Sequence, residues 1–256
     1  RLALIRSALG SDEPALLVVK QHRGDKGGKY VNVAVLEGDQ VKLVDETASS
    51  LPDCPGLVGS LLGFDSPQSW VGSMNVLVQL AVSMRAHGRG GLLLVVPSTS
   101  ETWRDSMVAP MAYSISPPYR GLSELVREGS SGPTGDRFQQ ALREVVDVIA
   151  GLTAVDGAAV MTDSYELLAF GAKIARRRGS PQVEQVTVTE PVVGGEARTM
   201  TPAQLGGTRH LSAAQFVHDQ RNAIALVASQ DRRFTVFAWS PCSDQVHGHQ
   251  VETLLL

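Results

Sequence analysis

The stretch GGLLLVVPS, residues 90–98, holds five consecutive apolar residues between a glycine pair and a proline. A short apolar run without alternation is typical of a strand buried on both faces of a sheet. Residues 74–90 predict a helix upstream, because apolar side chains recur there at helical spacing: Val76, Leu77, Leu80, Ala81 and Met84. A helix that leads into a fully buried strand favours an α/β fold.

The rest of the chain extends this pattern. The capping-box pattern Asp136-x-x-Gln139 predicts a second helix, with an apolar stripe of Phe138, Leu142, Val145, Ile149 and Leu152. Strands are predicted within residues 156–162, 166–174, 182–190, 222–230 and 233–239. The pair Asp231-Arg232 predicts a tight hairpin turn between the last two. We therefore expect a mixed central β-sheet flanked by helices.

The N-terminal part predicts a separate small α+β domain. Residues 1–9 look like the end of an amphipathic helix, residues 14–22 like a strand, and residues 30–46 like two strands around a glycine-containing turn at 37–39. A loop rich in Pro, Gly and Ser follows at residues 49–60. We place an accessory domain at residues 1–68 and the main domain at residues 69–256.

Composition excludes several classes of partner. The chain has 256 residues and a net charge of −3, so no basic field indicates nucleic-acid binding. No apolar run reaches the ~20 residues of a membrane span. The two cysteines, Cys54 and Cys242, lie far apart and fit a reducing compartment, so we expect a cytoplasmic protein. No phosphate-binding P-loop and no nucleophile-elbow motif is present in the sequence.

Two short polar runs have plain interpretations. His247 and His249, in HGHQ, fit a solvated tail, with metal binding as the alternative. The basic run ARRRGS, residues 175–180, fits a solvated turn, with phosphate or nucleic-acid contact as the alternative.

The stretch GGTRHLSAAQF, residues 206–216, carries the first chemical motif. The pattern Ser212-x-x-Gln215 predicts that a helix starts near Ser212. Residues 206–210 would then precede its N-terminus, where free backbone N–H groups and the helix dipole favour an anion. Arg209 adds a guanidinium suited to phosphate oxygens. The alternative is an ordinary glycine turn whose arginine reaches solvent.

Two further motifs flank that one. Asp156-Gly157 opens a predicted strand, where an exposed carboxylate can hold Mg²⁺ or Mn²⁺; an ordinary Asp-Gly turn is the alternative. Ser229, Gln230 and Asp231 end another strand and offer a hydroxyl and a second carboxylate; a polar hairpin tip is the alternative.

In their order along the chain, Asp156-Gly157-Ala158, then Gly207-Thr208-Arg209-His210, then Ser229-Gln230-Asp231, the motifs resemble those of the diadenylate cyclase domain family. The resemblance spans roughly residues 72–240, and GRGGLLLVVP, residues 88–97, resembles the family's first core strand. The residues ahead of it resemble the sensor-type accessory domains that are fused to some members.

The resemblance implies condensation of two ATP molecules into cyclic di-AMP with release of pyrophosphate. It implies a nucleotide site made of Gly157, Ala158, Gly207, Thr208, Arg209, His210 and Ser229. Asp156, Arg209 and His210 would be catalytic, and Asp156 and Asp231 would ligate Mg²⁺ or Mn²⁺. Two ATP molecules must meet, so the resemblance also implies a homodimer or higher oligomer with facing active sites.

Two positions depart from the family pattern. Leu211 stands where the family has a second arginine, and Gln230 replaces a carboxylate. The alternative function is therefore a catalytically degenerate domain that binds a nucleotide as a sensor. A purely structural assembly domain is a third interpretation.

Overall fold

The computed structural model describes residues 2–6, 17–22, 30–37, 40–44, 76–129, 135–253 and 255. Near the N-terminus, four antiparallel strands pair in the order β1 (Leu2–Arg6), β2 (Leu17–His22), β3 (Tyr30–Glu37) and β4 (Gln40–Leu43). The helix predicted at residues 1–9 is therefore wrong over residues 2–6, because so short an apolar run shows no period that separates helix from strand. The two strands predicted within residues 30–46 are confirmed.

The main sheet has nine strands in the order β10-β9-β13-β12-β11-β5-β7-β8-β6. Their bounds are β5 Gly91–Val96, β6 Ser114–Tyr119, β7 Ala158–Thr162, β8 Leu167–Ala172, β9 Val186–Thr189, β10 Arg198–Met200, β11 Ile224–Ala228, β12 Phe234–Ser240 and β13 Gln245–Gln250. The pairs β5–β7 and β13–β9 are parallel and the other pairs antiparallel, so the sheet is mixed, as predicted. Every residue of β5 is buried, which confirms the interpretation of the apolar run.

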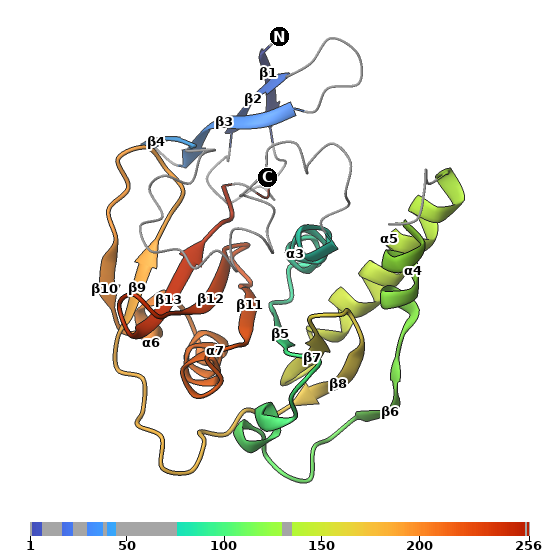
Figure 1. Ribbon diagram of the computed structural model, residues 1–256. Helices are drawn as coiled ribbons and strands as arrows, with labels where there is room; N and C mark the ends of the chain where they lie inside the picture. The colour runs from blue at the N-terminus through green and yellow to red at the C-terminus, as the bar shows by residue number, and fades with distance from the viewer. Residues whose placement is uncertain are drawn as a thin grey trace.

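Helices cover both faces of this sheet. They are α3 (Val76–Ala86), α4 (Gly121–Gly129), α5 (Asp136–Leu152), α6 (Pro202–Leu205) and α7 (Thr208–Asp219), with a 3₁₀ helix η1 at Thr102–Ser106. In Figure 1, α3 and α7 lie on opposite sides of the central strands. Two buried apolar clusters match this arrangement, one with α3 and α5 and the other with α7. The fold is thus mixed α/β, and the apolar stripe predicted on α5 faces the first cluster.

Two predicted helix starts need correction. The capping residue of α5 is Gly135 rather than Asp136, and no side chain caps it. Helix α7 starts at Thr208, four residues before the predicted Ser212, with Gly207 as its extended capping residue. The short helix α6 ends against Gly206, and the backbone turns through the two glycines directly into α7. Thr208, Arg209 and His210 therefore form the first turn of the helix instead of a loop before it.

The HGHQ segment is also corrected. It belongs to β13, which pairs with β12 on one side and β9 on the other, so both histidines are buried rather than solvated. Burial lowers the pKa of His249 to about 3, and its Nδ1 lies 2.7 Å from Thr189 Oγ1. Their partners on β12, Ala238 and Val236, belong to the first buried apolar cluster, so the two imidazoles lie on a covered face of the sheet.

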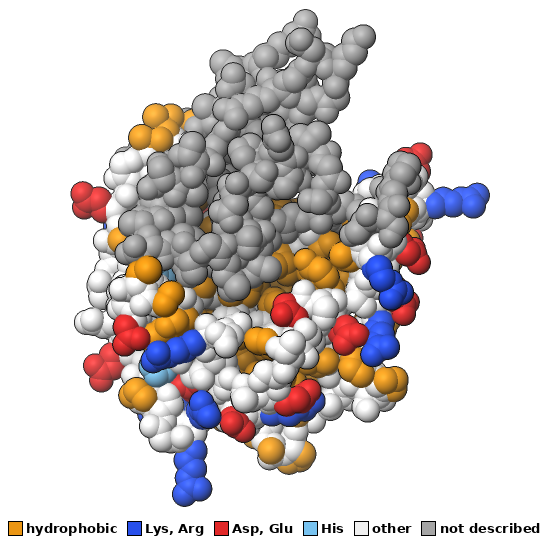
Figure 2. Space-filling model, viewed as in Figure 1, with side chains coloured by type: hydrophobic (Ala, Val, Ile, Leu, Met, Phe, Trp, Pro, Cys, Tyr) orange, Lys and Arg blue, Asp and Glu red, His pale blue; other side chains and the backbone are white. Residues whose placement is uncertain are grey.

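The two sheets touch near β4. Lys42 Nζ lies 2.9 Å from Glu190 Oε1, and Val44 bridges Val192 after β9. The predicted boundary between residues 68 and 69 lies outside the described residues. None of the helices in the described ranges is both long and apolar enough to cross a bilayer. Acidic and basic side chains lie interspersed on the face shown in Figure 2.

Candidate functional site

The three sequence motifs lie along one edge of the main sheet, the edge at which β11 ends and β5 and β7 begin. Ala228, at the end of β11, pairs with Gly91, at the start of β5. Strand β7 runs parallel to β5 and starts at the same edge, where its Ala158 pairs with Ala172 at the end of β8. The segments that follow β11 and precede β7 therefore lie at the same edge, although about 70 residues separate them in the sequence.

A cavity of about 140 Å³ joins two of the motifs at this edge. It is lined by Gly207, Thr208, Arg209, His210, Val227, Ala228, Ser229 and Gln230. Its residues thus come from the first turn of α7 and from the end of β11. The sequence predicted Gly207, Thr208, Arg209, His210 and Ser229 as neighbours in one site, and the structure places all five on this cavity.

The first turn of α7 gives the cavity its anion-binding character. No side chain caps Gly207, so backbone N–H groups at this helix start remain available to a ligand. The dipole of the 12-residue helix adds partial positive charge at that end. The Arg209 guanidinium lies beside Gly90, where a Cβ would come within 2.8 Å of Nη1. A helix start, a guanidinium and a serine hydroxyl on one small cavity are suited to a phosphate group.

His210 is held inside the fold next to this cavity. Only 3% of its surface is exposed, and its ring packs against Gly206 and edge-on to Phe237, with ring centroids 6.1 Å apart. Burial lowers its pKa, an effect that the Asp231 carboxylate partly opposes. The imidazole is therefore neutral at pH 7, and its contacts fix the first turn of α7.

Asp156 lies in the connection between α5 and β7 with 97% of its side chain exposed. Lys173 Nζ lies 2.6 Å from Asp156 Oδ2, and this hydrogen bond and charge lower the Asp156 pKa. The charge of Arg209 lowers it further, which couples Asp156 electrostatically to the cavity residue. Gly157 has φ of +128° and packs against the backbone of Gly171, so the turn after Asp156 requires glycine. The neighbouring Ala158 is buried as the first residue of β7.

The residues fit a metal that is shared with a substrate, rather than an all-protein metal site. Within the part of the chain that the structure describes, no group of three or more His, Cys, Asp or Glu side chains is placed to hold a metal ion. Asp231 does not line the cavity, and its carboxylate lies 3.5 Å from Arg233 Nε. Mg²⁺ commonly binds through one or two carboxylates together with substrate phosphates. The exposed carboxylate of Asp156 suits that arrangement.

Two residues at this edge carry no local signal in the sequence. Lys173 follows β8 and reaches Asp156 only because β8 pairs with β7. Tyr113 precedes β6, is 61% exposed, and stacks on Phe170 with ring centroids 4.8 Å apart. Its ring also lies against Gly171, the residue that contacts Gly157. An exposed aromatic ring beside the Asp156 turn offers a flat surface for a nucleobase.

A scan against protein-family models and a search of curated proteins found no match. Among solved structures, a double mutant of DacA from Staphylococcus aureus is similar over 68% of this chain and 83% of its own length. The sequence identity is 13% and the TM-score 0.35. So distant a likeness leaves the chemistry to be judged from the residues at the sheet edge.

Proposed function

We propose that this chain is a nucleotidyl cyclase of the diadenylate cyclase type, which joins two ATP molecules into cyclic di-AMP and releases pyrophosphate. The observation that carries the proposal is the cavity between the first turn of α7 and the end of β11. There the phosphate-binding chemistry of Thr208 and Arg209 meets Ser229, and the carboxylate of Asp156 lies at the same edge.

Each residue has a role that its chemistry allows. Backbone N–H groups of α7 and the Arg209 guanidinium would bind the triphosphate and stabilise the negative charge that develops at the reacting phosphorus. Asp156 would hold Mg²⁺ or Mn²⁺ together with phosphate oxygens and would orient the ribose 3′-hydroxyl. The metal, when bound, would neutralise phosphate charge. Lys173 keeps Asp156 ionised, because it lowers the pKa of that carboxyl group.

The size of the cavity supports an assembly of two chains. A cavity of about 140 Å³ holds a phosphate group, whereas pockets that enclose a whole ligand span about 300–1,000 Å³. The nucleoside would therefore extend from the cavity over the exposed side of Asp156 and Tyr113. A second copy whose edge faces this one would cover the nucleoside and supply the second ATP, as a symmetric dimer does.

The test is to incubate the purified protein with ATP and Mg²⁺ or Mn²⁺ and to analyse the products by mass spectrometry. We expect cyclic di-AMP and pyrophosphate, and we expect Asp156→Asn to abolish the product without changing the circular-dichroism spectrum. The proposal fails if neither metal gives a cyclic dinucleotide at any protein concentration that permits dimers.

A nucleotide sensor is the second candidate. It is favoured by Leu211, which leaves α7 without a second cation in its first turns, and by the ion pair that occupies Asp156. The expected signature is ATP binding without turnover. Leu211→Arg separates the two candidates: a cyclase should turn over faster with the added cation, whereas a sensor should bind ATP more tightly and still release no product.

A further inference from the structure

The cavity between the first turn of α7 and the end of β11 is called the motif cavity below. A larger pocket lies at the opposite edge of the main sheet. Its volume is about 650 Å³, within the range of about 300–1,000 Å³ that encloses whole small molecules. It is lined by residues 97–103 after β5, by the loop 177–181, and by residues 218–223 at the end of α7. Helix α7 therefore has the motif cavity at its first turn and this pocket at its last.

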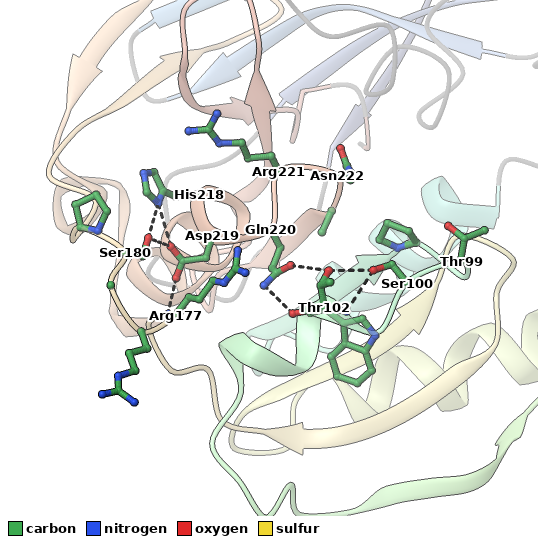
Figure 3. A pocket seen from close by; sticks show the side chains of 16 residues that line it. Thr99, Ser100, Thr102, Arg177, Ser180, His218, Asp219, Gln220, Arg221 and Asn222 are labelled. Carbon is green, nitrogen blue, oxygen red and sulfur yellow. Dashed lines mark hydrogen bonds and ion pairs between the residues drawn. The ribbon is translucent and has the colours of Figure 1, made fainter.

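The wall of this pocket is anchored by a buried carboxylate. Asp219 accepts hydrogen bonds from Arg177 N at 2.9 Å, from Gln215 Nε2 at 3.0 Å and from the Ser180 hydroxyl. His218 Nδ1 lies 3.0 Å from the same carboxylate. Figure 3 shows the bonds that join the Asp219 carboxylate to Ser180, His218 and Arg177. Because both of its carboxylate oxygens have partners within the protein, Asp219 holds the pocket wall in place, and other groups would contact the ligand.

That anchor holds an arginine-bearing turn. Ser180 N donates to Arg177 O across a turn whose third residue, Gly179, has φ of +83°, the geometry of a type II turn. Both ends of the turn are bound to Asp219, so Arg178 projects from a fixed corner. Arg178 is exposed, and its guanidinium makes no hydrogen bond or ion pair within the described residues. A cation held on a pre-formed corner loses little entropy when it binds an anion.

Two further arginines line the pocket; each pairs with an exposed carboxylate, and the Arg221 guanidinium also stacks on Trp239, 3.8 Å from its ring centroid. Arg177 Nη2 lies 3.8 Å from Asp105 Oδ2, and Arg221 Nη1 lies 3.4 Å from Asp244 Oδ1. All four side chains are half exposed or more, and exposed pairs of this kind contribute little to stability. A doubly charged phosphate can compete with such carboxylates, because guanidinium groups bind it in a bidentate fashion.

The floor adds neutral hydrogen-bonding groups. Gln220 is fixed by bonds to Thr102 O at 3.0 Å and to Ser106 Oγ at 2.9 Å, and Thr102 Oγ1 lies 3.3 Å from its Oε1. Figure 3 shows the bonds between Gln220 and Thr102, with the Ser100 side chain next to Thr102. Hydroxyl and amide groups around a cluster of arginines suit the sugar or polar ring of an organic phosphate.

We propose that this pocket is a second ligand site, which binds a phosphorylated small molecule of about nucleotide size through Arg177, Arg178 and Arg221. The site goes beyond the proposed cyclase activity and does not depend on it. Its position at the far end of α7 separates it from the motif cavity by the length of that helix, about 18 Å for 12 residues.

The experiment uses the full chain with Arg209→Gln, so that the cavity at the first turn of α7 contributes less to the signal. AMP, adenosine and inorganic phosphate are titrated separately by isothermal calorimetry. We expect AMP to bind at one site per chain with millimolar affinity or better, and adenosine to bind at least tenfold more weakly. Adding Arg177→Gln with Arg178→Gln should weaken AMP binding at least tenfold.

The matched control is Arg176→Gln, which removes the same charge from the same basic run at a residue that does not line the pocket. It should change AMP affinity by less than twofold. Arg178→Gln alone provides a variant that leaves every hydrogen bond of the turn intact. The proposal is overturned if folded protein gives no heat with 5 mM AMP, if adenosine binds as well as AMP, or if the Arg176 variant loses as much affinity as the pair.

Discussion

Replacing Arg209 with glutamine is the most direct test of whether the motif cavity binds the phosphates of ATP. The guanidinium lines the cavity beside the start of α7, and a hydrogen bond to a charged group contributes about 1.5–3 kcal/mol. Since about 1.4 kcal/mol corresponds to a factor of ten in affinity, the dissociation constant for ATP should rise roughly ten- to hundredfold. Solvent at the open side of the cavity favours the lower end of that range.

The assay is calorimetric titration with Mg-ATP at fixed ionic strength. Arg233→Gln is the matched control, because Arg233 lies on the β11–β12 hairpin that borders the cavity but pairs with Asp231 and does not line the cavity. It should leave ATP affinity within twofold. Arg209 makes no hydrogen bond or ion pair within the described residues, so its loss should change Tm by no more than about 2 °C.

The refuting result is clear-cut. If Arg209→Gln binds ATP within twofold of the unaltered protein, with an unchanged Tm, then the phosphates do not bind at the first turn of α7. The inference from the helix start and the cavity would then be wrong, whatever activity the protein has.

Three further predictions follow from other contacts. Gly157→Ala places a methyl group against the backbone of Gly171 at φ of +128°, so it should lower the free energy of unfolding by about 2 kcal/mol and Tm by about 4–8 °C in thermal melts. Gly151→Ala is the control: it has open space around it in α5 and should raise the free energy of unfolding by about 0.5–1 kcal/mol. Tyr113→Ala should weaken ATP binding about tenfold by loss of base stacking, and Tyr119→Ala, at the other end of β6, should not. Burial holds the pKa of His249 at about 3, so as pH falls below about 6.5 the unfolded chain takes up a proton before the folded one does. Urea denaturation should therefore show the free energy of unfolding falling by up to about 1.4 kcal/mol per pH unit between pH 6 and 4, and His249→Gln should flatten that slope.

The sequence predicted the elements whose signals are local. The apolar run of β5 and the hairpin between β11 and β12 needed only neighbouring residues, and both are confirmed. The sequence also predicted a helix start next to the Gly207–His210 motif, from the pattern Ser212-x-x-Gln215. Its boundary was wrong because the pattern from Ser212 to Gln215 imitates a capping box inside the helix.

Other features depend on pairing that no local pattern encodes. The polar residues of HGHQ do not mark a buried strand locally, because their burial follows from pairing with Ala238 and Val236 of β12, next to the first apolar cluster. Lys173 reaches Asp156 only through the pairing of β7 with β8. The large pocket draws on three segments more than 30 residues apart, and its buried anchor, Asp219, reads in sequence as an ordinary helix end.

The place of β13 in the sheet has a consequence for how the protein is made. This strand comes last along the described chain, yet it lies between β9 and β12, and it is the only link in the sheet between β9–β10 and the other strands. A ribosome delivers residues 245–250 after the other strands of this sheet, so until they emerge β9 and β12 each present an unpaired edge. Synthesis of this domain therefore includes an interval in which the nascent chain is open to wrong pairing, and a chaperone that shields strand edges would act in that interval.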